Sequence, residues 1–245
     1  MSRGGAGVYG TDYMADTGVI QSLPSLNVTA VDELEAALSL ERFGRYVKWA
    51  SGDKNRALEL YTLNSSLSES LYVPLQALEL ALRNRIHNVM KECYSERWFE
   101  CQEFVMEERN RKQVEVAKSD LEREKPGSSG ISSKVVAALT FSFWTSMVGA
   151  AYEELWRKTL FAIAKGSDGR PLPRKALSSP LTQIRLLRNR IAHHEPILYW
   201  RLPHYFDVAM DLTRYLSPPV ATWCDSVQKF KGVYPAGGYV LNKPL

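Results

Sequence analysis

The sequence predicts an all-α fold, and two observations support this. Leucines and aromatic residues recur at steps of three or four over most of the chain, which is the spacing that buries one face of a helix. Alternating runs of β-branched residues between hairpin turns, the pattern of paired strands, are not found in the sequence. We therefore expect a bundle of helices.

The first helices are expected between residues 29 and 61. Thr29 is a suitable helix N-cap, and the apolar pattern after it stops at Ser51-Gly52. Asp53 can cap a second, short helix that has Tyr61 on its apolar side. A longer helix is expected to begin at Ser65.

This longer helix is expected to reach Met90, because apolar residues form a continuous stripe up to that point, and Pro74 is expected to bend it. Residues 103–125 are charge-dense and have few apolar positions. They predict a solvated helix with a narrow contact face.

The most apolar segment, residues 135–164, predicts buried helices whose aromatic side chains lie in the core. A loop is expected over 166–173. Pro180 is expected in the first turn of the next helix, which continues to Pro196. A last helix is expected over 203–216.

Three parts of the chain are expected to differ in character. Residues 1–28 are glycine-rich and aperiodic, and predict a flexible tail. Residues 29–220 predict a single helical domain. Residues 221–245 predict a C-terminal extension, whose GVYPAGGYV string favours an extended segment.

The composition of the 245 residues is that of a globular protein, with 45% hydrophobic and 24% charged residues, so a wholly disordered chain is excluded. A net charge of +4 is compatible with RNA binding but too small to indicate it alone. Three cysteines without a CxxC pair exclude a disulfide framework and a cysteine-based zinc site. Because no apolar run has the length of a membrane span or the form of a signal peptide, we expect a cytoplasmic protein without membrane association.

The densest cluster of reactive side chains lies at the expected end of the helix before Pro196. It consists of Arg188-Asn189-Arg190-Ile191-Ala192-His193-His194-Glu195. Helical geometry stacks Asn189 and His193 as an i, i+4 pair and places Arg188 one step around the helix. His193 could take the proton from a ribose 2′-OH, and Arg188 could stabilise the charge on the attacked phosphate. These residues therefore suit phosphodiester cleavage without a metal.

Two other interpretations fit the same cluster. Arginine and histidine are favoured at helix C-termini, where they meet the negative end of the helix dipole, so the cluster could be structural. A metal could instead bind the set His193, His194, Glu195 and His204. Adjacent histidines on a helix point in different directions and HEXXH spacing is absent, so no metal site is expected.

The string LRNRI occurs twice, at 82–86 and 187–191. In the first copy only three residues separate Arg83 from His87, and Arg83 can pair with Glu79 on the preceding turn. We interpret Arg83 and His87 as structural. The alternative is that they line an RNA-binding groove.

The segment Arg188-Asn189-x3-His193 resembles the Arg-x(4–6)-His signature of HEPN ribonucleases, and the longer string LRNRIAHHEPI resembles abortive-infection (Abi-like) proteins. Two more blocks are similar to this family and occur in its order. They are Tyr61-x2-Asn64 with the run from Leu75 to Asn84, and LTFxFW from Leu139 to Trp144. Together the three blocks span roughly residues 38–215.

The resemblance implies an HEPN-type helical bundle with additional N-terminal helices, a homodimer, and RNA cleavage or binding in phage defence or a toxin–antitoxin system. It implies catalytic roles for Arg188, Asn189 and His193, with the Arg and His of two copies meeting across the dimer interface. Supporting or RNA-binding candidates are His194, Glu195, Arg190, Arg83, His87 and Tyr199. Tyr199 directly follows the motif and could stack on a base.

The expected function is a metal-independent endoribonuclease that needs no cofactor. Attack of a ribose 2′-OH on the adjacent phosphate would cleave RNA but not DNA. Other expected partners are a regulatory or antitoxin RNA and an antitoxin protein. One alternative is a non-catalytic RNA-binding protein or scaffold, and another is a helical interaction module whose Arg188–His193 segment packs a dimer interface.

Overall fold

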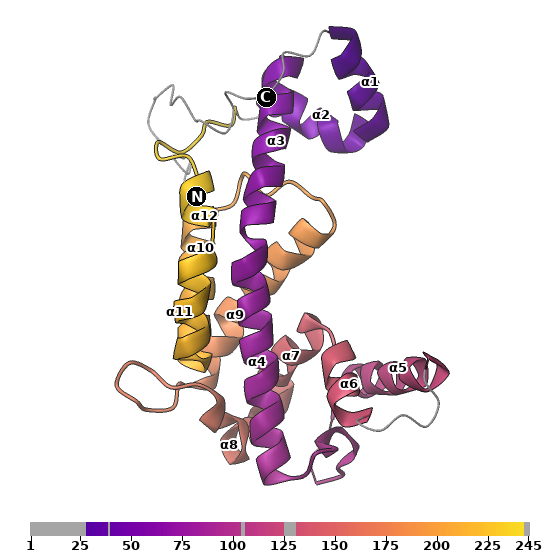
Figure 1. Cartoon of the computed structure of the whole chain (residues 1–245), viewed down its shortest axis with the longest axis vertical. Coiled ribbons are helices and arrows are strands. Elements are labelled where there is room, and N and C mark those ends of the chain that lie inside the picture. The colour runs from indigo at the N-terminus through magenta and orange to yellow at the C-terminus, as the bar shows by residue number, and fades with distance from the viewer. Residues whose placement is uncertain (1–27, 39, 104–105, 125–130, 243–245) are drawn as a thin grey trace, which may run out of the picture. The chain divides into compact units, whose positions relative to one another are not determined.

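The structure is a computed structural model that describes residues 28–38, 40–103, 106–124 and 131–242. Its described residues form helices joined by loops and contain no strand, which confirms the predicted all-α class (Figure 1). Of the predicted flexible tail over 1–28, all but the last residue lies outside the described part. None of the described helices combines the length and apolarity that crossing a bilayer requires.

The described chain divides into two compact units, each assembled from several stretches of sequence. The first takes its described residues from 28–72, Arg190–Leu202 and 228–242, and the second consists of Val73–Asn189 and Pro203–Val227. The chain passes from the second unit to the first within helix α9 (Arg174–Ala192). The limits of these two units do not coincide with the expected boundaries after residues 28 and 220. A single domain over 29–220 stays a prediction.

The first unit contains α1 (Val28–Leu38), α2 (Leu40–Trp49), α3 (Lys54–Ser70) and the short α12 (Phe230–Val233). As predicted, α2 is followed by Ser51 and Gly52, both at positive φ, and Asp53 caps α3 by accepting a hydrogen bond of 3.0 Å from the Arg56 N–H. These features were predictable because each depends on residues close together in the chain.

The predicted helix start at Ser65 was wrong, because α3 runs through this serine to Ser70. The hydroxyl of Ser65 donates to the Tyr61 carbonyl at 3.1 Å, and that of Ser68 donates to the Asn64 carbonyl at 2.7 Å. These bonds to the preceding turn let serines remain inside a helix.

The break comes instead at Leu71, after which α4 (Tyr72–Cys93) begins. Pro74 lies in the first turn of α4 and does not bend the middle of a longer helix. The position suits proline, because the first-turn N–H groups have no partner within the helix.

The second unit holds the remaining elements. They are α4, η1 (Trp98–Glu100), α5 (Glu108–Glu124), α6 (Ile131–Ala138), α7 (Phe141–Met147), η2 (Ala150–Tyr152), α8 (Glu153–Lys158), η3 (Leu160–Ile163), α9, α10 (Leu202–Leu216) and α11 (Pro218–Val227). Trp98, Phe143 and Trp144 are fully buried and pack with ring centroids 4.9–6.4 Å apart. The core location predicted for the aromatics of residues 135–164 is confirmed for Phe141, Phe143, Trp144, Tyr152 and Trp156.

Helix α9 starts at Arg174, so Pro180 lies inside it and the predicted first-turn position was wrong. The Arg174 guanidinium pairs with Glu153 and donates to the Val148 carbonyl at 3.1 Å. This anchor holds the helix start upstream of the proline, which supplies no N–H for the Ala176 carbonyl. The loop predicted over 166–173 is confirmed. The helix predicted over 203–216 is observed as α10, but it is not the last, because α11 and α12 follow it and occupy part of the predicted C-terminal extension.

Candidate functional site

The candidate site begins at the C-terminus of α9, where the chain turns sharply. The Glu195 N–H donates to the Arg190 carbonyl at 2.8 Å, and the His194 N–H donates to the Ile191 carbonyl at 3.1 Å. This is the Schellman pattern, in which the residue at the position of His194 is left-handed and commonly glycine. His194 has φ of +56°, and His193 is the first residue beyond the helix. The helix therefore ends at Ala192, short of the predicted limit at Pro196, and His193 is not stacked on Asn189 within it.

Buried contacts fix the chain that follows this turn. Pro196, Ile197 and Leu198 are buried, and the Ile197 N–H donates to the side-chain oxygen of Asn64 on α3 at 2.8 Å. The Tyr239 hydroxyl donates to the Leu198 carbonyl at 2.7 Å. Asn64 is thus a positioning residue, and a buried amide paired in this way is costly to remove.

Arg190 is held by a carboxylate and two aromatic rings. Its guanidinium lies 2.7 Å from the Glu195 carboxylate, and over the rings of Tyr199 and Trp200 at 5.4 and 5.7 Å from their centroids. Tyr199 in turn packs against Trp49 of α2, with centroids 6.1 Å apart. Because Tyr199 is half-buried in this stack, its contacts support orientation of Arg190 more directly than stacking on a base.

The end of α9 opens on a cavity of about 590 Å³ within the first unit. It is lined by Arg42, Arg45, Arg190, His193, His194, Glu195 and Pro196. Three guanidiniums and one carboxylate give a formal charge of 3 − 1 = +2 before any imidazole is protonated. His193 and His194 are exposed, and neither imidazole makes a hydrogen bond to another described residue. The cavity can therefore bind an anion and offer it two imidazoles.

Arg42 and Arg45 of α2 were not among the predicted site residues. They lie three residues apart on the solvent side of a helix whose Phe43 and Tyr46 are buried. This spacing shows a basic face in the sequence. The sequence around α2, however, does not indicate that this face lies beside the turn that follows α9.

Arg188 and Asn189, the other two motif residues, belong to the second unit and are half-buried on α9. The Arg188 guanidinium lies 3.9 Å from the carboxylate of Glu79 on α4. Burial raises the pKa of Glu79, although Arg188 and Arg83 both act to lower it. Arg83 thus acts on Glu79 electrostatically, but its guanidinium donates to the side-chain oxygen of Asn84 at 3.2 Å, and the predicted ion pair with Glu79 is not among the contacts of the described residues.

His87, which directly follows the first LRNRI copy, is half-buried and contacts the core of the second unit. The indole N–H of Trp98 donates to Nδ1 of His87 at 3.0 Å. Burial lowers the pKa of His87, and the nearby Lys91 adds to this effect. Arg85 donates to the carbonyls of Ala162 and Ile163 at 2.9 and 3.0 Å. These contacts favour the structural interpretation of the first copy.

Acidification through pH 6.5 is expected to destabilise the fold through His87. Its folded pKa lies below the ordinary value of 6.5, so between the two values the unfolded chain binds more protons and stability falls as pH falls. The loss should be absent above about pH 7.5.

Melting temperatures at pH 7.5 and 5.5 measure this loss. His87→Asn keeps an acceptor for Trp98 but does not titrate, so the drop between the two pH values should be smaller than in wild type. An equal drop in both proteins would show that His87 contributes nothing to it.

The described residues contain no group of three or more His, Cys, Asp and Glu side chains placed to hold a metal ion. The alternative set of His193, His194, Glu195 and His204 is thus not assembled there. No family model, curated protein or solved structure matches this chain. The resemblance to Abi-like HEPN proteins stays a prediction that rests on the quoted motifs.

Proposed function

We propose that the cavity at the end of α9 binds the phosphodiester backbone of RNA and that His193 initiates its cleavage. The observation that carries the proposal is the cavity lining, in which Arg42, Arg45 and Arg190 surround two exposed imidazoles. Guanidiniums match the geometry of phosphate oxygens, and imidazoles exchange protons near neutral pH. The combination suits transfer of a phosphoryl group between two ribose oxygens.

In this mechanism the neutral imidazole of His193 takes the proton from the ribose 2′-OH. The 2′-oxygen then bonds to the adjacent phosphorus, and the bond from phosphorus to the 5′-oxygen breaks. Protonated His194 gives its proton to the leaving 5′-oxygen. The products are a 2′,3′-cyclic phosphate and a 5′-OH, and proton exchange with water restores both histidines. Arg190 and the two α2 arginines stabilise the charge on the phosphate oxygens.

Cleavage is expected to proceed in EDTA, because every group in this mechanism belongs to the chain. The substrate is a labelled DNA oligonucleotide with one ribonucleotide, and the all-DNA strand is the control. We expect a single cut after the ribonucleotide, a cyclic phosphate end and no cut in the control. Activity that EDTA abolishes and Mg²⁺ restores would contradict the mechanism.

The wider proposal follows the resemblance. We place the ribonuclease in the cytoplasm, in phage defence or a toxin–antitoxin system, as a homodimer restrained by an antitoxin RNA or protein. A site shared between the Arg and His of two copies is part of what the resemblance implies. Toxicity on expression that disappears in catalytic variants would support this role.

A second candidate function is RNA binding without cleavage. The contacts of Arg190 with Glu195, Tyr199 and Trp200 favour it, because a guanidinium fixed on aromatic rings is a stable phosphate or base contact even without proton transfer. RNA that binds to the wild-type protein and is recovered intact would favour this candidate over the first.

A further inference from the structure

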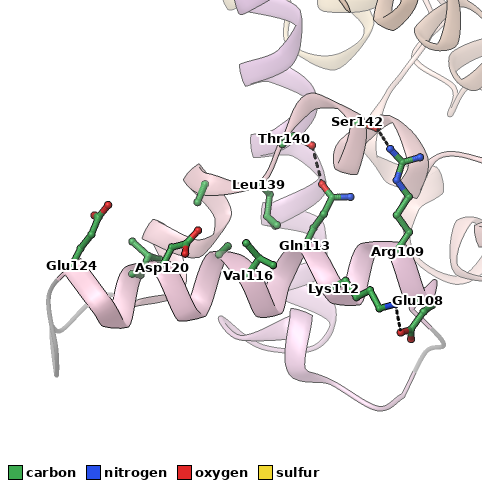
Figure 2. A pocket seen from close by; sticks show the side chains of 13 residues that line it. Glu108, Arg109, Lys112, Gln113, Val116, Asp120, Glu124, Leu139, Thr140 and Ser142 are labelled. Atoms are coloured by element: carbon green, nitrogen blue, oxygen red, sulfur yellow. Dashed lines mark hydrogen bonds and ion pairs between the residues drawn. The ribbon is translucent and has the colours of Figure 1, made fainter.

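Helix α5 carries an exposed face in the second unit. A hollow of about 1020 Å³ lies along this face, between α5 and the chain from α6 into α7. Val116, near the middle of α5, is 59% exposed and lines the hollow with Ala117, Leu121, Ala138 and Leu139. Figure 2 shows Val116 between charged residues at both ends of the helix.

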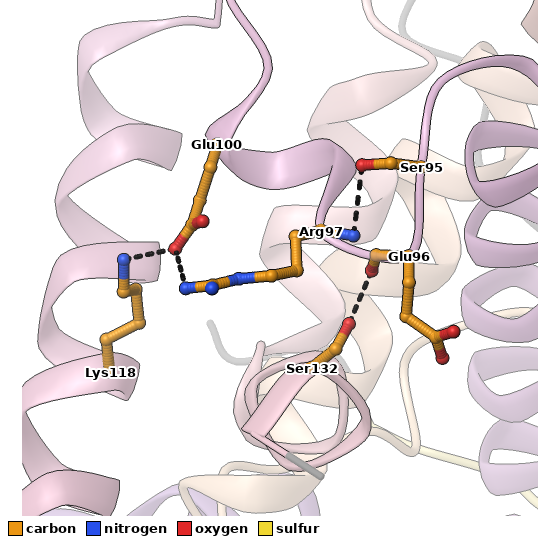
Figure 3. Close-up of polar contacts among 6 residues, drawn as sticks. All are labelled: Ser95, Glu96, Arg97, Glu100, Lys118 and Ser132. Atoms are coloured by element: carbon orange, nitrogen blue, oxygen red, sulfur yellow. Dashed lines mark hydrogen bonds and ion pairs between the residues drawn. The ribbon is translucent and has the colours of Figure 1, made fainter.

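Other contacts already fix α5 to the second unit. Val114 and Ala117 are buried, and Lys118 forms an ion pair with Glu100, which also pairs with Arg97 at 2.8 Å (Figure 3). The partial burial of Glu100 raises its pKa, but hydrogen bonds from Lys118 and Arg97 outweigh this and leave the pKa lowered. The charged side chains at the contact of α5 with η1 are thus already paired with one another.

The charges of α5 are distributed unevenly along its axis. Residues 108–112 carry three positive charges and one negative, 3 − 1 = +2, whereas residues 120–124 carry one positive and three negative, 1 − 3 = −2. A helix dipole favours the opposite order, with anions at the N-terminus and cations at the C-terminus. Within one chain this arrangement is unfavourable, but an antiparallel copy would complement it.

We infer that α5 pairs antiparallel with α5 of a second copy of this chain, with Val116 of each copy at the two-fold axis. Lys112 and Asp120 lie four residues on either side of Val116, so each Lys112 would face an Asp120 across the axis. In the same register Arg109 would face Arg123 and Glu108 would face Glu124, so the attraction comes from the Lys112–Asp120 pairs and from the opposite net charges of the two helix ends. An interface related by a two-fold axis must be self-complementary, and here the net charges of the two helix ends and the shared apolar centre meet that condition.

The partners that these side chains have within one chain do not prevent the pairing. Lys112 lies 3.4 Å from Glu108 and Asp120 lies 2.9 Å from Arg123, and all four side chains are more than half exposed. Exposed pairs one helical turn apart contribute little, so they can exchange for contacts across the axis. The pairing does not depend on the proposed function.

The test is the mass of the full chain in solution at low and high salt, measured by light scattering. We expect a dimer that weakens as salt rises. Lys112→Glu and Asp120→Lys should each shift the protein toward monomer, because each variant places two like charges opposite one another at both symmetry-related contacts. The double variant restores the opposite charges and should restore the dimer. Both positions are exposed, and melting temperatures will confirm that the variants fold.

A second measurement places the axis. Val116→Cys should form a disulfide-linked dimer on mild oxidation, beyond any link that wild type makes through Cys93 or Cys101. A monomeric wild type, or single charge variants that dimerise as tightly as wild type, would overturn the inference. So would capture of α5 by a different protein while the chain alone stays monomeric. None of these outcomes depends on RNA cleavage.

Discussion

Replacing His193 with alanine is expected to slow RNA cleavage by roughly 10²–10⁴-fold, the usual contribution of a general base. The imidazole is exposed at the cavity and makes no hydrogen bond to another described residue, so its removal should leave the fold intact. RNA affinity should change little, because the neutral base adds no charge to the site. Single-turnover cleavage, fluorescence anisotropy with RNA and melting temperature measure the three quantities.

His194→Gly is the matched variant, because it removes the second imidazole and also relieves the backbone. A non-glycine residue in the left-handed region costs roughly 1–2 kcal/mol, so this variant should be at least as stable as wild type. Because His194 is assigned as the general acid, its loss should slow cleavage of ordinary RNA by roughly 10²–10⁴-fold.

An RNA with sulfur in place of the bridging 5′-oxygen distinguishes the catalytic roles of the two histidines. A thiolate leaves without protonation, so this substrate should restore cleavage by His194→Gly but not by His193→Ala. A folded His193→Ala protein that cuts ordinary RNA at the wild-type rate would return the motif to a helix-capping role. Wild-type cleavage with no effect of His194→Gly would remove only the role of His194.

The fold was predictable where neighbouring residues determine it. The cap at Asp53 and the stop at Ser51-Gly52 depend on side-chain chemistry and backbone freedom within a few residues, and both are found. The errors at Ser65 and Pro180 arose because serine and proline are poor helix residues on average. The hydrogen bond from the Ser65 hydroxyl to the preceding turn, and the ion pair of Arg174 with Glu153, keep these two positions helical despite that low average preference.

The candidate site was predictable only in part, for the same reason. The turn at His193 and His194 follows from the sequence around Pro196, but the approach of Arg42 and Arg45 depends on the packing of distant segments. The ion pair between Arg188 and Glu79 is tertiary as well. Spacing on α9 identifies which residues are close in the chain, whereas only the structure shows that Arg190 lines the cavity with His193.

Arg190→Ala is therefore expected to reduce cleavage by roughly 10²–10³-fold, the typical effect of removing one group that stabilises transition-state charge. RNA affinity should fall as well, and the slope of log affinity against log salt should decrease by about 0.7, as expected for one lost contact with a single strand. Arg190→Lys keeps the positive charge but lacks the planar guanidinium, so its cleavage rate and RNA affinity should lie between those of wild type and Arg190→Ala. Glu195→Gln is the structural control, since it removes the same ion pair but keeps the guanidinium.

Arg188→Ala provides the comparison that decides between the two arginines. Arg188 pairs with Glu79 in the second unit, so its loss should leave Glu79 beside Arg83 and raise the pKa of that carboxyl further. We expect a smaller loss of cleavage than for Arg190→Ala and no change in the salt slope. The motif alone predicts the reverse order, because it assigns the catalytic cation to Arg188. If Arg188→Ala abolishes cleavage while Arg190→Ala retains it, the role implied by the resemblance is right, and the cavity beside His193 is not where the phosphate binds.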